Sequence, residues 1–240
     1  MKVTLIKCPS ELEALETMYT AAQTCYSADV PSVIYEKSKT RSKQTMIDLI
    51  TKVLNSKHYS ICEHVDVTLS VEGISRACSH QFVRHRLCTY SQQSQRYVNF
   101  SDKSFDFITP PKIAANEGLK IEYEAMMAEL KSLYDRMCKY DIPAEDARYL
   151  LPNAAATNIT FTTNLRNLIH ICELRLCSRA QWEVRAVYRD IAAEVIKALP
   201  IMKDYLVPQC ERQGYCTELK CCGRKKRFED TFKVLEEDNE

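Results

Sequence analysis

The side chains best suited to chemistry lie in one stretch, residues 81–100. This stretch contains three arginines and four glutamines interleaved with aromatic residues, and it contains no Lys, Asp or Glu. Guanidinium and amide groups are planar donors that grip phosphate oxygens and the edges of a base. A solvated protein face usually mixes Lys with Asp and Glu instead. We therefore interpret the stretch as an anion-binding site; the alternative is a basic surface face.

The glycine content limits how a phosphate is held. The chain has four glycines among 240 residues, none of them spaced as G-x-G-x-x-G, and it has no G-K-[S/T]. These two patterns bind phosphates through the backbone N–H groups of glycine-rich loops. A nucleotide bound to this chain must therefore be held by side chains or by helix N-termini.

Four motifs in a fixed order carry a family resemblance. Residues 84–94 fit the pattern RHR-x7-S, and residues 58–64 read HYSICEH. Residues 147–152 contain A-R followed by L-P, and residues 164–183 contain N-x-R, L-R and A-Q-W-E. This ordered set, which extends over about residues 20–200, resembles the flavin-dependent thymidylate synthases.

The resemblance implies an activity, cofactors and an assembly. Such enzymes methylate dUMP reductively to dTMP, with methylenetetrahydrofolate as the one-carbon donor and FAD, reduced by NADPH, as the hydride source; tetrahydrofolate is released. They are homotetramers with active sites shared between subunits. The fold is then α+β, a single domain with a central antiparallel sheet flanked by long helices. We place this domain at residues 1–207 and a Cys-rich, charged tail at residues 208–240.

The resemblance also assigns residues to each ligand. Those expected to bind the flavin are His58, Ser60, Glu63, Arg84, His85, Arg86, Gln92, Asn164, Arg166 and His170. Those expected to bind dUMP are Gln81, Arg84, Gln92, Gln93, Ser94, Gln95, Arg96, Arg148 and Arg175, with Arg96 and Arg148 on the phosphate. Arg175 is the expected catalytic residue, because it stabilises negative charge at the N3/O4 edge of uracil when C5 acts as the nucleophile.

The sequence departs from the family pattern at three positions. Gln92 stands where Glu is common, Ser91 where Asn is frequent and Gln23 where Arg is expected. The first two differences concern the contacts made by residues 91–93, and they leave RHR-x7-S intact.

Histidines and tail cysteines raise the question of a metal. None of the five histidines fits the helical H-E-x-x-H pattern, so we expect no catalytic metal. The tail holds Cys210, Cys216, Cys221 and Cys222 without the usual C-x2-C spacing. Free thiols without a role are the simpler interpretation of these four residues, and a zinc site is the alternative.

Other function classes fit the composition less well. A nucleic-acid-binding module would have a pI above about 9, whereas this sequence has a pI of about 7.5. A metal-dependent hydrolase needs a ligand set that the sequence does not assemble. No apolar run reaches the roughly 18–20 residues of a membrane span. The N-terminal stretch reaches an acidic residue within its first dozen positions, which is unlike a signal peptide. We therefore expect a cytoplasmic protein that binds neither nucleic acid nor membranes.

Hydrophobic patterns predict the elements that position these residues. A strand is expected at residues 1–8, followed by a helix that starts at a capping box of Ser10 and Glu13. Alternation predicts a half-buried strand at residues 65–71. Further expected elements are helices at 41–55 and 74–82, a loop at 87–111, a helix at 112–140, a strand at 158–163 and helices at 164–177 and 179–198.

Overall fold

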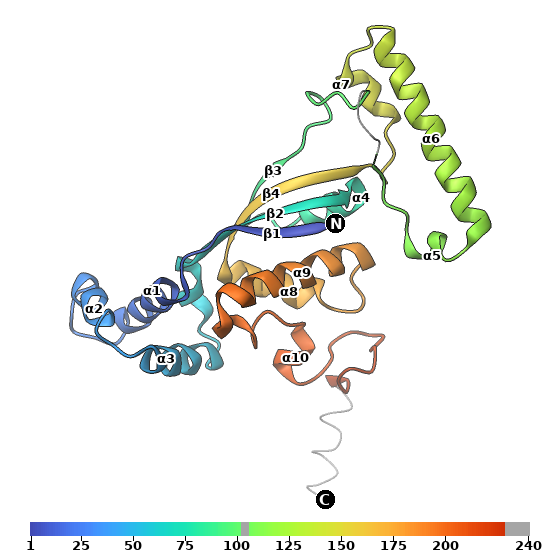
Figure 1. The fold of residues 1–240 in the computed structure, drawn as a ribbon. Helices are drawn as coiled ribbons and strands as arrows, with labels where there is room; N and C mark the ends of the chain where they lie inside the picture. The colour runs from blue at the N-terminus through green and yellow to red at the C-terminus, as the bar shows by residue number, and fades with distance from the viewer. Residues whose placement is uncertain (102–105, 229–240) are drawn as a thin grey trace, which may run out of the picture. The chain divides into compact units, whose positions relative to one another are not determined.

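Helices and one antiparallel sheet make up the protein, as the α+β prediction requires. The computed structural model describes residues 1–101 and 106–228. The sheet has four strands in the order β1-β2-β4-β3 (Figure 1). Its strands are β1 (Lys2–Lys7), β2 (Asp66–Ser75), β3 (Thr89–Gln92) and β4 (Ala156–Asn164).

The chain divides into two compact units. The first unit comprises residues 1–2, 70–86 and 90–161, and the second comprises residues 3–69, 87–89 and 162 onward. The domain boundary between residues 207 and 208 stays a prediction, and residues 229–240 of the tail lie outside the described residues.

Strand β2 buries one of its two faces, as the alternating pattern at residues 65–71 predicts. Val67, Leu69 and Val71 are fully buried, while the intervening Thr68 and Ser70 are half-buried. Successive side chains of a strand point to opposite faces, so this strand buries its apolar face and leaves the other partly open. The strand continues to Ser75, whose hydroxyl accepts a hydrogen bond from the backbone N–H of Cys78 and caps the next helix.

Helix α4 (Arg76–Phe82) of the first unit directly follows strand β2, and the other helices of the unit come after strand β3. The single helix predicted at 112–140 is wrong, because residues 115–116 separate two helices and the Asn116 side chain accepts a hydrogen bond from Leu119 N at 3.1 Å. The predicted loop at 87–111 contains strand β3. The elements of this unit include α4 (Arg76–Phe82), α5 (Pro111–Ala114), α6 (Glu117–Lys139), α7 (Ala144–Ala147) and the 3₁₀ helix η2 (Arg148–Leu150).

The first helix of the second unit starts at the predicted capping box. Ser10 N donates to the Glu13 carboxylate at 2.8 Å and Glu13 N donates to Ser10 Oγ at 3.3 Å. The spacing of Leu12, Leu15 and Met18 predicts that all three lie on one buried face of this helix. Leu15 and Met18 are buried, but the prediction is wrong for Leu12, which is 51% exposed. The helices of the unit are α1 (Glu11–Thr24), α2 (Pro31–Ser38), α3 (Lys43–Asn55), η1 (Tyr59–His64), α8 (Leu165–Arg175), α9 (Trp182–Ala198), η3 (Pro200–Met202) and α10 (Gln209–Gln213).

Packing in the second unit joins segments far apart in the sequence. Helix α1 packs against α2, α3 and η1, and α8 packs against η1, α9 and α10. The sequence did not predict α2, η1 or α10. None of the helices within residues 1–101 and 106–228 combines the length and apolar character needed to cross a bilayer.

Candidate active site

The turn after α4 carries the RHR motif in the first unit. Arg84 and Arg86 are exposed, and His85 between them is buried. The hydroxyl oxygen of Tyr90 lies 3.0 Å from the carbonyl oxygen of Phe82 and 2.9 Å from that of His85. These contacts hold the turn against the strand that follows it. Two cations therefore stand in solvent on either side of an anchored histidine.

Strand β4 holds the glutamines that follow the turn. Gln92 Nε2 donates to Thr157 Oγ1 at 3.3 Å, and Asn158 Nδ2 donates to Gln93 Oε1 at 2.9 Å. The backbone of Gln93 is also fixed, because its N–H donates to the carbonyl of Asn158 at 2.9 Å. Gln93 and Gln95 line a cavity of about 560 Å³ in the same unit. Sequence reasoning had no signal for Thr157 and Asn158, which come from a distant strand.

Two arginines predicted to bind phosphate meet at helix α7. Arg96 Nε lies 2.5 Å from the carboxylate of Glu145, and Arg148 Nε donates to the backbone carbonyl of Glu145 at 3.0 Å. Ser94 Oγ accepts hydrogen bonds from Arg96 N at 3.0 Å and from Tyr97 N at 3.3 Å. The structure thus brings Ser94, Arg96 and Arg148 into one cluster, which we call the arginine cluster.

Arg76 is a third cation near this cluster, and the site assignment missed it. Its Nη1 lies 3.5 Å from both the Gln93 carbonyl and the Thr157 hydroxyl. Burial, and then the nearby charge of Arg148, lower the pKa of the Arg76 guanidinium. Two like charges held together favour an anion between or beside them. The signal that could have found it is its position five residues before the arginine-rich stretch at 81–100, with no Asp or Glu in between.

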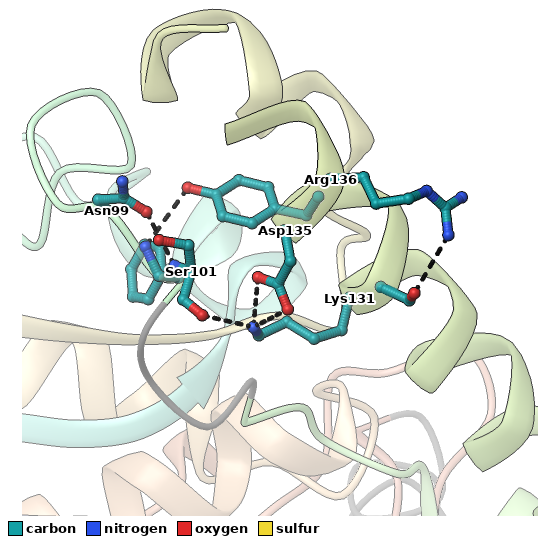
Figure 2. Close-up of polar contacts among 8 residues, drawn as sticks. Asn99, Ser101, Lys131, Asp135 and Arg136 are labelled. Atoms are coloured by element: carbon teal, nitrogen blue, oxygen red, sulfur yellow. Dashed lines mark hydrogen bonds and ion pairs between the residues drawn. The ribbon is translucent and has the colours of Figure 1, made fainter. Parts of the chain in front are cut away.

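Helix α6 anchors the end of the loop that carries Ser94 and Arg96 of the arginine cluster (Figure 2). Phe100 N donates to the hydroxyl of buried Tyr134 at 3.4 Å. Lys131 Nζ donates to the Ser101 carbonyl at 3.2 Å and pairs with the Asp135 carboxylate at 2.5 Å. Because loop positions depend on such contacts, α6 helps to fix residues 93–101.

Tyr134→Phe is expected to loosen this anchor. The variant removes the acceptor for Phe100 N and so lowers the free energy of unfolding by about 1 kcal/mol. Amide hydrogen exchange of the peptide containing Phe100 is expected to accelerate. Tyr140→Phe is the matched control, because Tyr140 is 81% exposed. Unchanged exchange at Phe100 in the Tyr134 variant would contradict the anchoring role.

In the second unit, η1 brings two predicted flavin residues to a cavity. His58 and Ser60 line a cavity of about 560 Å³ together with His64 and residues of α1 and α2. Hydroxyl and imidazole groups stand there against mostly apolar walls such as Ile61. Glu63 is exposed and is not among the lining residues.

Helix α8 presents the polar residues that the sequence assigned to it. Asn164 caps the helix, because its Oδ1 accepts a hydrogen bond from Asn167 N at 2.8 Å. The Arg166 guanidinium carbon lies 5.1 Å from the centroid of the Tyr59 ring. His170 Nδ1 lies 3.8 Å from Glu173 Oε2 and the imidazole is well exposed. Helix α8 and η1 pack together, so Arg166 and His170 belong to the same part of the second unit as His58 and Ser60.

The remaining predicted residues fall in both units. Gln81 is half-buried on α4 of the first unit, and Arg175 is half-buried in the last turn of α8 of the second unit. The structure thus gathers most predicted dUMP residues in the first unit and the residues of η1 and α8 in the second. Arg175 belongs to the second unit.

Comparisons with known protein sequences show which family the chain belongs to. Residues 7–201 match the sequence family described as thymidylate synthase complementing protein. The flavin-dependent thymidylate synthase of Nitratidesulfovibrio vulgaris is 39% identical over 229 residues, which cover 88% of this chain and 91% of the relative. The flavin-dependent thymidylate synthase of Geobacter sulfurreducens is 37% identical over 236 residues, which cover 98% of this chain and 99% of the relative. The flavin-dependent thymidylate synthase of Thermococcus kodakarensis is 42% identical over 194 residues, which cover 78% of this chain and 79% of the relative.

The chain belongs to the flavin-dependent thymidylate synthase family. It is accordingly an enzyme of dTMP synthesis, a methyltransferase that depends on a flavin. The donor sets of the two units suit such an enzyme. Exposed Arg84 and Arg86 suit anionic phosphates, and the apolar cavity beside Ser60 suits an aromatic ring system.

Cysteines of the C-terminal tail lie beside helix α8. Cys177, Cys210, Cys216 and Cys222 line a small cavity of about 60 Å³, and the side chains of Cys216 and Cys221 are within hydrogen-bonding reach. Within the described ranges 1–101 and 106–228, no three His, Cys, Asp or Glu side chains are grouped so as to hold a metal ion.

Thiol alkylation is expected to discriminate among the cysteines. Burial raises the pKa of the Cys62 thiol to about 12 and also raises that of Cys172. A hydrogen bond with Ser178 lowers the pKa of exposed Cys222. Because the thiolate is the reactive form, iodoacetamide at neutral pH should modify Cys222 first and spare Cys62 until the protein is unfolded. Peptide mass spectrometry over time would measure this order, and early modification of Cys62 would contradict it.

Proposed function

We propose that the chain methylates dUMP reductively to dTMP, with methylenetetrahydrofolate as the one-carbon donor and FAD, reduced by NADPH, as the hydride source. The arginine cluster is the observation that carries the dUMP assignment. A nucleoside monophosphate is close to dianionic at neutral pH, and guanidinium groups bind its oxygens strongly. Arg96 and Arg148 bind the phosphate, and Arg76 adds charge beside them.

The residues of η1, α8 and the RHR turn would hold FAD. When bound, FAD supplies the hydride chemistry. The guanidinium groups of Arg84 and Arg86 would bind its phosphates, with His85 and Gln92 beside them. The residues assigned from η1 and α8 are His58, Ser60, Glu63, Asn164, Arg166 and His170. Gln81, Gln93, Ser94 and Gln95 would orient dUMP, and Arg175 would stabilise the charge that develops on its uracil ring.

The active enzyme is proposed to be a cytoplasmic homotetramer whose active sites are shared between subunits. Exposed apolar side chains on α6 support an oligomer, since Leu119, Ile121, Met126 and Leu133 are 38–62% exposed. Exposed apolar groups of this kind are commonly buried in subunit interfaces. Sedimentation equilibrium would test this state: a tetramer has about four times the 27.7 kDa mass of the chain.

One titration followed by an assay tests the proposed function. Purified protein is titrated with FAD and then with dUMP while the visible flavin absorption is recorded. Two successive changes of the flavin band are expected, because the two ligands adjoin. Formation of dTMP from dUMP, methylenetetrahydrofolate and NADPH is then measured directly. Folded protein that takes up no FAD would refute the proposal at its cofactor.

A further inference from the structure

A side chain near the C-terminus links the two elements that carry predicted flavin residues in the second unit. Arg212 of α10 forms an ion pair with Glu173 of α8. Its guanidinium carbon also lies 4.7 Å from the centroid of the Tyr59 ring in η1. One guanidinium thus contacts both α8 and η1.

This link is largely removed from solvent. The side chains of Arg212 and Glu173 are 15% and 12% exposed. Nε and Nη1 of Arg212 are buried and have no hydrogen-bond partner in the described part of the chain. A buried ion pair is screened much less than an exposed one, and the face of a tyrosine ring attracts a cation. The guanidinium therefore restrains both Glu173 and Tyr59.

Tyr59 connects this restraint to the cavity. The Arg166 guanidinium carbon lies 5.1 Å from the centroid of the same ring, so one tyrosine contacts two cations. His58 and Ser60, the neighbours of Tyr59 in the chain, both line the cavity of about 560 Å³. A shift of the Tyr59 ring would move these two residues and Arg166 together.

Glu173 extends the effect of Arg212 to His170, another residue on the polar face of α8. Its second carboxylate oxygen lies 3.8 Å from Nδ1 of His170. If Arg212 is removed, Glu173 keeps a buried negative charge without its main partner and must rearrange. His170, which depends on Glu173 for this contact, would lose its position as well.

We propose that Arg212 is a positioning residue for the flavin site, holding Tyr59 and Glu173 so that η1 and α8 present their flavin-binding side chains at a fixed spacing. This inference rests on the proposed function. It extends the site past residue 201, where the family match ends, and gives the C-terminal segment a part in cofactor binding.

Arg212→Gln tests the proposal with a readout independent of turnover. The dissociation constant of FAD is expected to rise about tenfold and the visible flavin band to change shape, because misplaced groups bind their ligand poorly. Arg212→Lys is expected to recover most of the affinity, since an ammonium group retains the ion pair and the contact with the ring. Arg224→Gln is the matched control, because Nε of Arg224 lies 3.7 Å from a carboxylate oxygen of Glu211, which like Arg212 is in α10, and the Arg224 side chain is 49% exposed. This control should bind FAD as the wild type does.

The outcomes separate this proposal from the proposed function. Wild-type protein that takes up no FAD refutes both. Wild-type protein that binds FAD, beside a folded Arg212→Gln variant with an unchanged dissociation constant and band, overturns the positioning role alone. Loss of thermal stability without loss of affinity overturns it too. Should Arg212→Gln fail to fold, Glu173→Gln removes the same ion pair with less change in shape; a several-fold weaker FAD affinity supports the proposal, and wild-type affinity overturns it.

Discussion

Arg175→Ala is expected to lower the rate of dTMP formation by about 100-fold or more while the protein stays folded. In the proposed reaction, uracil C5 attacks the one-carbon unit only as negative charge develops at the N3/O4 edge of the ring. A fixed guanidinium stabilises that charge, and removal of one such donor typically costs about 100- to 1,000-fold in rate. Arg175 lies in the last turn of α8, half-buried, so the rigid helix sets its position. Single-turnover measurement of dTMP would give the rate of the chemical step.

The control for this variant is a nearby arginine without a proposed role in the site. Arg179 is exposed and pairs with Glu218 at 3.2 Å, so Arg179→Ala removes the same charge four residues further along the chain. It is expected to retain nearly the wild-type rate. The affinity of Arg175→Ala for dUMP is measured separately from the change in the flavin band. A variant that loses only dUMP affinity, and not the rate of the chemical step, would show that Arg175 binds substrate rather than acting in catalysis. A wild-type rate of dTMP formation in the Arg175→Ala variant would contradict the proposed catalytic role of Arg175.

Local signals predicted the elements that depend mainly on nearby residues. The capping box of Ser10 and Glu13 starts α1, and alternation places the buried face of β2, because both effects act within a few residues. The split of the predicted helix at residues 112–140 was not foreseen. Ala114, Ala115 and Glu117 beside Asn116 are good helix formers, and the Asn116 cap competes with the continuous helix by one hydrogen bond.

The sequence motifs assigned residues to the candidate site where hydrophobic patterns gave no signal, but only residues that lie within the motifs. Arg76 was missed because its closeness to Arg148 depends on how the chain folds over the 71 intervening positions. Arg212 was missed for the same reason: its partners on η1 and α8 lie far earlier in the chain. Such contacts arise from tertiary packing, which a single sequence does not encode as a local pattern. The assigned ligand contacts themselves remain predictions until they are measured.

Arg96→Ala is expected to weaken dUMP binding by about 10- to 100-fold, which corresponds to the roughly 1.5–3 kcal/mol of a hydrogen bond to a charged group. Binding of FAD should change by less than about threefold, a difference under 0.7 kcal/mol. Titration of the flavin band with dUMP, after FAD is saturating, measures the first quantity, and the preceding FAD titration measures the second. Arg136→Ala is the control, because this exposed arginine donates a hydrogen bond to Ser132 of its own helix and has no proposed contact with either ligand. Equal losses for both ligands would contradict the assignment of Arg96 to the phosphate.

The ion pair between Arg96 and Glu145 sharpens this prediction. At 54% and 45% exposure the pair contributes little stability, so the guanidinium is free to exchange the carboxylate for a phosphate. Glu145→Gln removes that competing charge yet keeps the backbone carbonyl that accepts from Arg148 Nε. This variant should therefore bind dUMP as tightly as the wild type or more tightly, in the opposite direction from Arg96→Ala. Weaker dUMP binding in Glu145→Gln would mean that the carboxylate holds Arg96 in its binding position rather than competing for it.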